Sequence, residues 1–277
     1  MEPRLQKRVQ RYGWDLAAAG YEPLWQAQLA GARAGLLARA ALTPGERVLD
    51  VACGTGLISF EAARAVAPDG VVVGVDLSER MVDASRRRAR LRQAANATFI
   101  RMDAEQLSFP DGGFDVALCG LGLMYAPEPG QVLREMRRVL KPGGRMISAV
   151  WGEPARCGWA GLFEIVDAEV ESDVCPLFFR LGQHDTLARQ CAEAGFCEVE
   201  VGRVNATLDY CDGNEACDAA FVGGPVALAW SRFDAGTQTR VRARYLESIE
   251  PWRRGRRYAV PAEFVIVAAA VPPEWAS

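Results

Sequence analysis

The chain has 277 residues, of which 50% are hydrophobic and 24% charged, and this composition fits one α/β domain with additions better than two independent domains. It carries 32 Lys and Arg against 35 Asp and Glu, so the formal net charge of -3 gives no overall positive field. We therefore expect no binding to nucleic acid or to an anionic membrane.

Targeting and cysteine patterns favour the cytoplasm. No apolar run is long enough to span a bilayer, and the start of the chain at Met1 lacks the apolar stretch of a secretory signal. The eight cysteines form no C-x-x-C pair and have no recognisable ligand spacing. We expect a cytoplasmic protein with reduced thiols and no metal site.

The amino-terminal region is predicted to be helical. The stretch from Leu16 to Leu42 is rich in alanine, and Trp25, Leu29 and Leu36 fall at helical spacings along one stripe. This stripe should pack against the rest of the molecule.

From Arg47 to Trp151, short β-rich runs alternate with helical stretches, a pattern typical of a parallel sheet with right-handed crossovers. Buried strands are expected at Val48 to Val51, Val71 to Asp76, Thr98 to Met102, Phe114 to Cys119 and Arg145 to Val150. Helices are expected at Leu57 to Ala67, Glu79 to Ala94 with Ser78 as its cap, and Gln131 to Leu140 before the turn Lys141-Pro142-Gly143-Gly144.

The region after Trp151 should complete the sheet and cover its edge. A helix is expected at Thr186 to Ala194, strands at Cys197 to Val204 and Glu263 to Val271, and a further helix at Gln238 to Ile249. The stretches at about 152–181 and 208–260 are too long for ordinary loops and are expected to form caps.

The most informative segment is a buried strand that runs into a glycine turn and then a helix. Gly54 and Gly56 let the backbone approach a ligand closely and can adopt a positive φ. A dinucleotide site would need Gly or Ala at the position of Ser59, so the fit to NAD is poor.

Carboxylates follow three successive strands of the expected sheet: Asp50, Asp76 and Asp103. Such groups suit a cationic amino-acid moiety, ribose hydroxyls and an adenine amino group better than they suit pyrophosphate.

These motifs resemble those of the class I S-adenosylmethionine-dependent methyltransferases, in the branch similar to ubiquinone and menaquinone C-methyltransferases and many natural-product methyltransferases. The resemblance covers about Thr43 to Trp151 and includes the signature Asp50-x-Ala52-x-Gly54-x-Gly56. Ala52 departs from the family's first glycine, which matters only if that residue needs a positive φ.

The resemblance implies a Rossmann-like, doubly wound, seven-stranded α/β sheet whose last strand is antiparallel, with helical cap insertions. It divides the single structural domain into an amino-terminal helical lid (1–42), a core that binds S-adenosylmethionine (43–151) and a region that completes the sheet and caps the substrate (152–277). Its cofactor is S-adenosyl-L-methionine, and the product is S-adenosyl-L-homocysteine.

By the same resemblance, each part of the cofactor has its expected residues. The methionine part should lie against Asp50, Ala52, Cys53, Gly54 and Gly56, with its amine on a backbone carbonyl at Cys119 or Gly120; the ribose should bind Asp76; and the adenine should lie against Leu77, Met81, Asp103 and Ala104. Trp14 and Tyr21 are candidates to close over the cofactor, with core packing as the alternative.

A sulfonium methyl is already activated, so the protein mainly has to align a nucleophile and exclude water. Tyr125, in the loop after the fourth strand, is the candidate acid or base, with packing under the loop as the alternative. His184 is a weaker candidate, because an exposed loop position before a helix explains it equally simply.

The sequence contains two basic clusters. The run Arg86 to Arg90 is interpreted as a solvated helix face, whereas Arg253 and Arg254, in the expected cap, are candidates to bind an anionic group of the substrate if they are not simply solvated.

The leading hypothesis is methyl transfer to a small organic molecule, with O-, N- and C-acceptors, a natural-product or quinone-like intermediate among them, left open. A nucleic-acid base methyltransferase would usually show Asn or Asp before Pro-Pro-aromatic where Cys119-Gly120-Leu121-Gly122 stands. A metalloid methyltransferase, an NAD enzyme and an inactive cofactor-binding regulator or partner protein are the remaining alternatives. Pairing of cap surfaces into a homodimer is left open.

Overall fold

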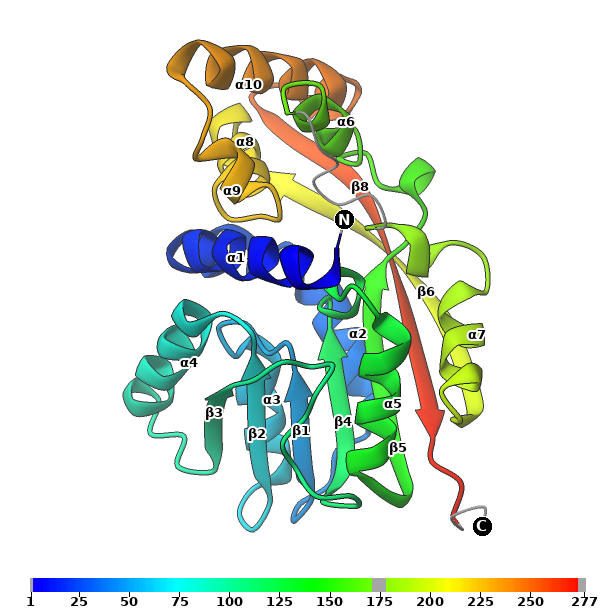
Figure 1. Cartoon of the computed structure of the whole chain (residues 1–277). Helices are drawn as coiled ribbons and strands as arrows, with labels where there is room; N and C mark the ends of the chain where they lie inside the picture. Colours follow the sequence, from blue (N-terminus) through cyan, green and yellow to red (C-terminus); the bar gives the residue numbers. More distant parts are fainter. Residues whose placement is uncertain (1, 171–177, 274–277) are drawn as a thin grey trace.

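The computed structural model describes residues 2–170 and 178–273, which form one mixed sheet covered by helices on both faces (Figure 1). The strand order is β3-β2-β1-β4-β5-β8-β6, and a short strand, β7, pairs only with β8. The strands are β1 (Arg47–Val51), β2 (Val71–Asp76), β3 (Ala97–Arg101), β4 (Phe114–Gly120), β5 (Leu140–Trp151), β6 (Cys197–Tyr210), β7 (Arg253–Arg254) and β8 (Arg257–Ala270).

The sheet changes direction at its last strand. Strands β1 to β5 run parallel, whereas β8 is antiparallel to both β5 and β6, between which it lies. The predicted doubly wound sheet with an antiparallel last strand is therefore confirmed. The two residues of β7 add an eighth strand that the sequence did not predict.

Two hydrophobic clusters lie on opposite faces of the sheet because alternate residues of each buried strand point to opposite sides. Leu49 and Ala117 belong to the cluster with α5, and Val48 and Val116 to the cluster with α2 and α3.

The helices are α1 (Pro3–Trp25), α2 (Ala30–Ala40), α3 (Leu57–Val66), α4 (Glu79–Leu91), α5 (Pro129–Val139), α6 (Leu162–Asp167), α7 (Thr186–Glu193), α8 (Gly213–Phe221), α9 (Ala227–Trp230) and α10 (Ala235–Ile249). Short 3-10 turns lie at η1 (Leu123–Tyr125), η2 (Pro154–Arg156), η3 (Arg180–Gly182) and η4 (Glu250–Trp252).

The amino-terminal prediction was wrong in its bounds. The stretch from Leu16 to Leu42 forms two helices, α1 and α2, and α1 already begins at Pro3. In its first half, Leu5, Val9 and Tyr12 fall at helical spacing, but Leu5 and Tyr12 are exposed. This half packs on other elements through Gln10 and Gly13, which are buried. In Figure 1, α1 crosses the carboxyl ends of the parallel strands.

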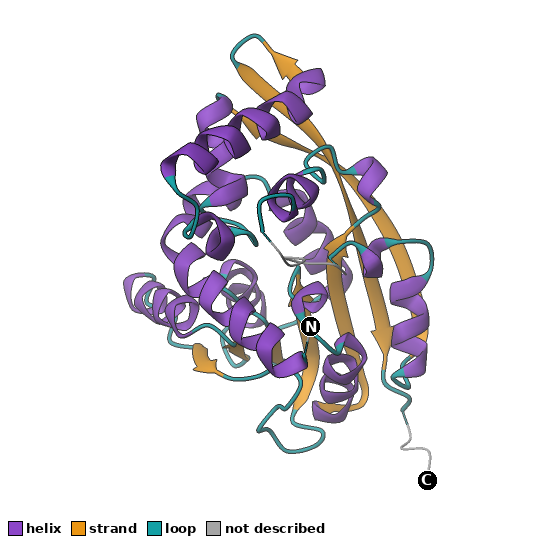
Figure 2. Cartoon of the chain, turned by 45° about the horizontal axis from the view of Figure 1, so that its top comes forward, coloured by secondary structure: helices purple, strands orange, loops and turns teal. Residues whose placement is uncertain are grey.

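The last two long strands extend further than predicted. Strand β6 continues to Tyr210 and β8 begins at Arg257, so the residues from 257 to 260 belong to the sheet and not to a cap. Figure 2 shows these strands running past the parallel half of the sheet toward α8, α9 and α10. Part of the expected cap at 152–181 lies outside the described residues.

Smaller predictions concern caps, turns and thiols. The Ser78 side chain accepts a hydrogen bond from the Met81 amide, which confirms it as the cap of α4. The expected turn at Lys141 to Gly144 appears as an irregularity in β5, where the pairing with β4 shifts register.

The seven described cysteines are free thiols, and Cys175 lies outside the described residues. Within residues 2–170 and 178–273, no helix has the length and apolarity needed to cross a membrane.

Candidate active site

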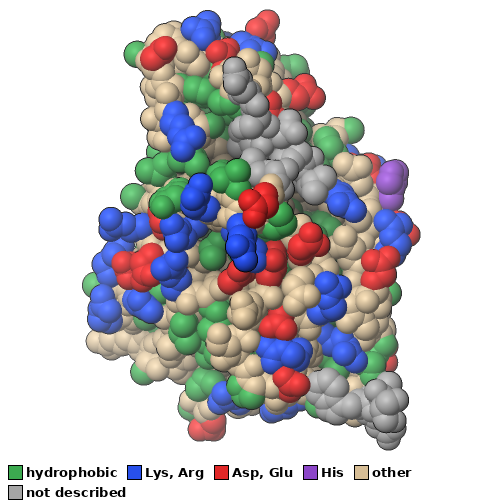
Figure 3. All heavy atoms as spheres, viewed as in Figure 1, with side chains coloured by type: hydrophobic (Ala, Val, Ile, Leu, Met, Phe, Trp, Pro, Cys, Tyr) green, Lys and Arg blue, Asp and Glu red, His purple; other side chains and the backbone are tan. Residues whose placement is uncertain are grey.

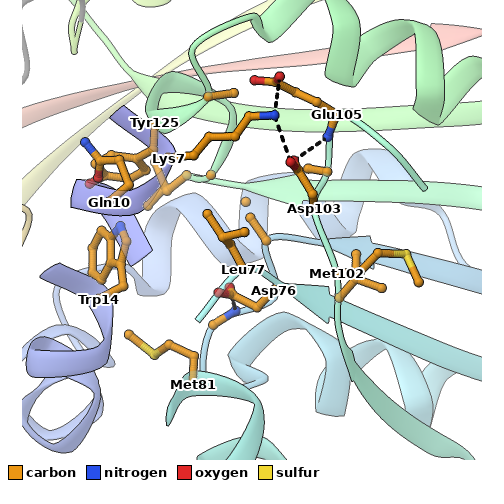
Figure 4. Close-up of a pocket in the computed structure, with 18 of the residues that line it drawn as sticks. Lys7, Gln10, Trp14, Asp76, Leu77, Met81, Met102, Asp103, Glu105 and Tyr125 are labelled. Carbon is orange, nitrogen blue, oxygen red and sulfur yellow. Dashed lines mark hydrogen bonds and ion pairs between the residues drawn. The ribbon is translucent and has the colours of Figure 1, made fainter. Parts of the chain in front are cut away.

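A pocket opens at the carboxyl edge of the parallel strands, beneath α1 (Figure 4). We call it the edge pocket. Predicted site residues that line it are Trp14, Tyr21, Ala52, Gly54, Asp76, Leu77, Met81, Asp103, Ala104, Gly120 and Tyr125. The sequence placed the residues of the core, such as Asp76 and Asp103, at or just after separate strand ends, and the parallel arrangement of β1 to β4 brings those ends to one place. Trp14 and Tyr21 reach the pocket from α1.

Asp76 is held rigidly at the floor of the edge pocket. Its Oδ2 accepts a hydrogen bond from the Gly54 amide at 2.8 Å, and its Oδ1 accepts one from the Ser78 amide at 2.9 Å. Burial raises the pKa of Asp76 to about 6, although these amide hydrogen bonds oppose the rise. Each carboxylate oxygen has more than one lone pair, so Asp76 retains acceptor capacity for a ligand.

Asp50 lies in a separate, adjoining cavity, the side pocket, which Cys53 also lines. Its Oδ2 accepts a hydrogen bond from the Ser59 hydroxyl at 2.5 Å, and burial raises the pKa of Asp50 to about 7. Ser59, the residue that argued against a dinucleotide site, is thus the partner of the signature carboxylate. The sequence did not identify this role.

The glycine turn needs left-handed backbone at three places. Ala52, Gly54 and Gly56 have φ of 55°, 54° and 87°. The departure at Ala52 therefore falls where a glycine would be less strained, because an L-residue with a side chain rarely adopts a positive φ.

Asp103 is paired with a lysine that the sequence did not identify. Lys7 Nζ, from α1, lies 2.7 Å from Asp103 Oδ2 and 2.6 Å from Glu105 Oε2. Burial lowers the pKa of Lys7, but the hydrogen bonds and charges of both carboxylates outweigh it and raise the pKa overall. Gln10 also lines the edge pocket. Lys7, Gln10 and Trp14 are spaced at helical intervals, a signal that extending the predicted helix toward Pro3 would have revealed.

Two further contacts hold α1 against α4. Asp15 accepts hydrogen bonds from the Ser78 hydroxyl at 2.6 Å and the Arg80 amide at 3.2 Å. Glu22 forms an ion pair with Arg88, whose guanidinium also donates to the Thr55 carbonyl at 3.0 Å. Lys and Arg side chains gather at the left of Figure 3, where α1 and α4 lie.

The prediction of a wholly solvated basic face on α4 was therefore wrong. Arg88 joins α4 to α1, and Arg86 donates to the Phe99 carbonyl at 3.0 Å. Arg87 and Arg90 are exposed, as predicted. The difference arises because α1 packs along α4, which the sequence did not indicate.

Other predicted residues lie outside the edge pocket. Gly56 and Cys119 line neither the edge pocket nor the side pocket, and the Cys119 carbonyl accepts a hydrogen bond from the Ser148 hydroxyl at 3.1 Å. His184 is exposed in a loop. Arg253 and Arg254 are exposed on β7, where their guanidinium groups bond to nearby backbone carbonyls. The structure does not bring His184, Arg253 or Arg254 to the site.

A third cavity adjoins the edge pocket and is lined by aromatic rings. We call it the aromatic chamber. Its described lining consists of Trp14, Tyr21, Trp25, Leu29, Leu121, Tyr125, Trp151, Trp159, Phe178, Gly224 and Pro225. Tyr125 meets Trp14 edge to face with centroids 5.0 Å apart, and meets Phe178 similarly at 5.4 Å. Tyr125 thus stands between the two cavities.

A parallel sheet with a glycine turn and buried carboxylates at its carboxyl edge defines a Rossmann-like protein that binds a nucleoside-containing cofactor. Comparisons with known proteins identify the class further. Residues 42–173 match the family model of a methyltransferase domain. Over 187 residues the chain is 34% identical to the demethylmenaquinone methyltransferase of Geobacillus kaustophilus strain HTA426, spanning 61% of this chain and 78% of that relative.

Solved structures share the fold at low sequence identity. Phosphoethanolamine N-methyltransferase 2 of Haemonchus contortus, in complex with phosphomonomethylethanolamine and S-adenosylhomocysteine, superposes with a TM-score of 0.60 at 16% identity, covering 93% of this chain and 57% of that chain. The [4+2]-cyclase SpnF gives a TM-score of 0.57 at 23% identity, covering 87% of this chain and 80% of that chain.

The chain belongs to the class I S-adenosylmethionine-dependent methyltransferases. It is an enzyme that transfers a methyl group from S-adenosylmethionine to a small molecule, so the cofactor predicted from the sequence is confirmed.

Proposed function

We propose that the methyl acceptor is a quinone-like or related natural-product intermediate that binds in the aromatic chamber while S-adenosylmethionine occupies the edge pocket. The observation that carries this proposal is the shared wall: Trp14, Tyr21, Leu121 and Tyr125 line both cavities. Ligands in the two cavities would meet at these residues. The name of the Geobacillus relative, a demethylmenaquinone methyltransferase, supports a quinone-like acceptor.

The edge pocket suits the cofactor in both shape and chemistry. A Cβ at Gly54 would meet only Tyr21, at 4.0 Å, so the backbone of the turn is open to a ligand. In this proposal Asp76 accepts hydrogen bonds from the ribose hydroxyls. Leu77 and Met81 pack on the faces of the adenine. Asp103 and the Ala104 amide form hydrogen bonds with the edge of the adenine ring. The remaining roles concern the methionine part: Ala52, Gly54 and the carbonyl at Gly120, rather than that at Cys119, face it, whereas Asp50, Cys53 and Gly56 shape the turn.

Helix α1 acts as a lid in this proposal. Its Lys7, Gln10 and Trp14 line one side of the edge pocket (Figure 4). Ion pairs and hydrogen bonds from Lys7 and Asp15 tie it to the strand ends. A closed α1 would exclude water from the reacting groups, which strengthens electrostatic interactions within the site.

Bound S-adenosylmethionine supplies an activated sulfonium methyl, so the chain's own residues mainly position the acceptor. The rings of the aromatic chamber would hold a flat acceptor against Tyr125. The Tyr125 hydroxyl is proposed to accept the proton that an acceptor hydroxyl loses while it passes its own proton to solvent. Unchanged turnover in Tyr125→Phe, with Tyr12→Phe on the exposed face of α1 as control, would remove this role.

The proposal is tested first by calorimetry and then by turnover. S-adenosylmethionine and S-adenosylhomocysteine should bind the purified protein, and NAD should not. Quinone-like, phenolic and amine acceptors are then supplied with S-adenosylmethionine, and S-adenosylhomocysteine formation is measured. If neither S-adenosylmethionine nor S-adenosylhomocysteine binds, the proposed cofactor site is wrong. If only amines are methylated, the proposal of a quinone-like acceptor is wrong.

A further inference from the structure

Two tryptophans in the wall of the aromatic chamber have buried indole N–H groups that find no partner among the residues the structure describes. The Nε1 atoms of Trp25 and Trp159 have no hydrogen-bond acceptor within the described residues. Both side chains are deeply buried, at 5% and 3% exposure. An unpaired buried donor costs about 1 to 3 kcal/mol, so it is usually satisfied in a functioning protein.

The rings that carry the two donors lie near each other and belong to separate elements. Trp25 ends α1, and Trp159 lies in the segment before α6. Their ring centroids are 6.5 Å apart at an interplanar angle of 68°, and both rings also meet Trp151 edge to face. One small ligand in the chamber would therefore contact both rings.

The described part of the chamber's lining offers no charge to a ligand. Its described lining consists of aromatic and aliphatic side chains and glycine, with no Lys, Arg, Asp or Glu among them. Among these described residues a charged group would be desolvated without a counter-charge, which is costly. A neutral apolar ring with a polar oxygen meets no such penalty.

We propose that Trp25 and Trp159 recognise a neutral oxygen acceptor, a carbonyl or phenolic oxygen, on the ring of the methyl acceptor. This inference rests on the proposed function and deepens it, because it names the two donors that orient the ring. A planar bicyclic or monocyclic ring carrying such an oxygen fits the chamber's chemistry.

A cationic acceptor is the competing ligand, because aromatic walls also bind ammonium groups through the faces of their rings. Here several rings pack edge to face on one another, among them Trp25 on Trp151 and Tyr125 on Phe178, which covers part of those faces. The unpaired N–H groups are positive edges and would repel a cation. These contacts favour the neutral oxygen.

The test compares ligands that differ by one oxygen. Calorimetry measures binding of 1-naphthol, naphthalene and tetramethylammonium, with and without saturating S-adenosylhomocysteine. Trp25→Phe and Trp159→Phe keep an aromatic ring and remove the N–H. Trp230→Phe is the matched control, because Trp230 stacks on Phe221 outside the chamber, with centroids 4.6 Å apart.

Wild type should bind 1-naphthol more tightly than naphthalene. Each chamber variant should lose about three- to tenfold in affinity for 1-naphthol, the effect of one hydrogen bond, and stay within about twofold for naphthalene. Trp230→Phe should match wild type for both.

Equal losses for the two probes would mean that the tryptophans only pack, and tighter binding of tetramethylammonium would assign a cation site; either result overturns the inference. Failure of S-adenosylhomocysteine to bind would instead contradict the proposed function, and it is read in a separate titration. Melting temperatures of the variants show that each is folded.

Discussion

Strands β1 to β4 and helix α1 both line the edge pocket, but they are tied to it in different ways. The strand ends belong to a parallel sheet in which each strand pairs with its neighbours along its length. Helix α1 is tied to those strand ends and to α4 largely by side chains, among them Lys7, Asp15 and Glu22.

This difference predicts different consequences for substitutions. Groups on the sheet are positioned before any ligand binds, so their loss should lower affinity directly. Groups on α1 are held by partly exposed ion pairs, which are weaker and are screened by salt. Their loss should mainly change how quickly the pocket opens.

The largest effect is expected at Asp76. In Asp76→Asn, one oxygen that accepts hydrogen bonds becomes an NH2 group, so contacts to the ribose hydroxyls and to the Gly54 or Ser78 amide are impaired. Loss of charge-assisted hydrogen bonds predicts about a 100-fold weaker affinity for S-adenosylhomocysteine by calorimetry.

Asp83→Asn serves as the control, because Asp83 is partly exposed on α4 and pairs only weakly with Arg86, at 3.6 Å. Affinity in this variant should equal that of wild type. A loss of similar size in both variants would show that the charge of the region matters more than the hydrogen bonds of Asp76.

The core could be predicted because its signals are local. Val71 to Asp76 was predicted with its observed bounds, since the run is buried and β-rich and ends at a polar residue. The acidic strand ends then met at one edge because parallel strands share a direction. The partner of Asp50 was missed, because the role of Ser59 depends on the turn bringing the start of α3 back onto the strand.

Cofactor affinity should depend on pH through the same carboxylate. In the free protein, burial raises the pKa of Asp76 to about 6. Below that pH the group is protonated and must lose its proton to accept ribose hydroxyls fully. The affinity for S-adenosylhomocysteine should therefore fall by up to about fivefold as the pH is lowered from 6 to 5.

Titration at several pH values checks this dependence, and Asp76→Asn should remove most of it. If the affinity of Asp76→Asn for S-adenosylhomocysteine falls with pH as steeply as that of wild type, Asp50 is the group responsible, because burial raises its pKa to about 7. An affinity that does not change between pH 5 and 7 would show that neither carboxylate changes its protonation on binding.

A smaller effect is expected from α1. Lys7→Met removes the cation between Asp103 and Glu105 but keeps the apolar stem. Stopped-flow measurements should show S-adenosylhomocysteine dissociating about fivefold faster, the loss of roughly 1 kcal/mol from a partly exposed pair.

The matched control is Arg8→Met, since Arg8 is an exposed residue of the same helix. Raising the salt concentration should speed dissociation from wild type but not from Lys7→Met. Tighter cofactor binding in Lys7→Met would contradict the lid, because it would mean that Lys7 competes with adenine for Asp103.

The elements outside the core, α1 and the insertion that carries Arg253 and Arg254, could not be predicted in the same way. The first half of α1 exposes its apolar Leu5 and Tyr12 and turns the polar Lys7 and Gln10 toward the site, an orientation that an apolar pattern does not predict. Arg253 and Arg254 looked like a substrate site because they lie in an insertion, but their guanidinium groups bond to neighbouring carbonyls. Substrate contacts depend on how distant segments pack.

The smallest effect concerns the strain in the glycine turn. Ala52→Gly would relieve a side chain held at a φ of 55°. That relief is worth about 1 to 2 kcal/mol, and the greater freedom of glycine in the unfolded chain offsets about 0.4 to 1 kcal/mol of it. The net gain should raise the melting temperature by a few degrees at most.

Gly54→Ala makes the opposite change two residues later in the same turn. Its φ is 54°, and the added Cβ would have only Tyr21 near it, at 4.0 Å, so backbone strain without a clash should lower the melting temperature. Opposite shifts in the two variants would show that backbone conformation limits the stability of this turn. A lower melting temperature in both would instead show that the Ala52 methyl group contributes more through packing than its backbone loses through strain.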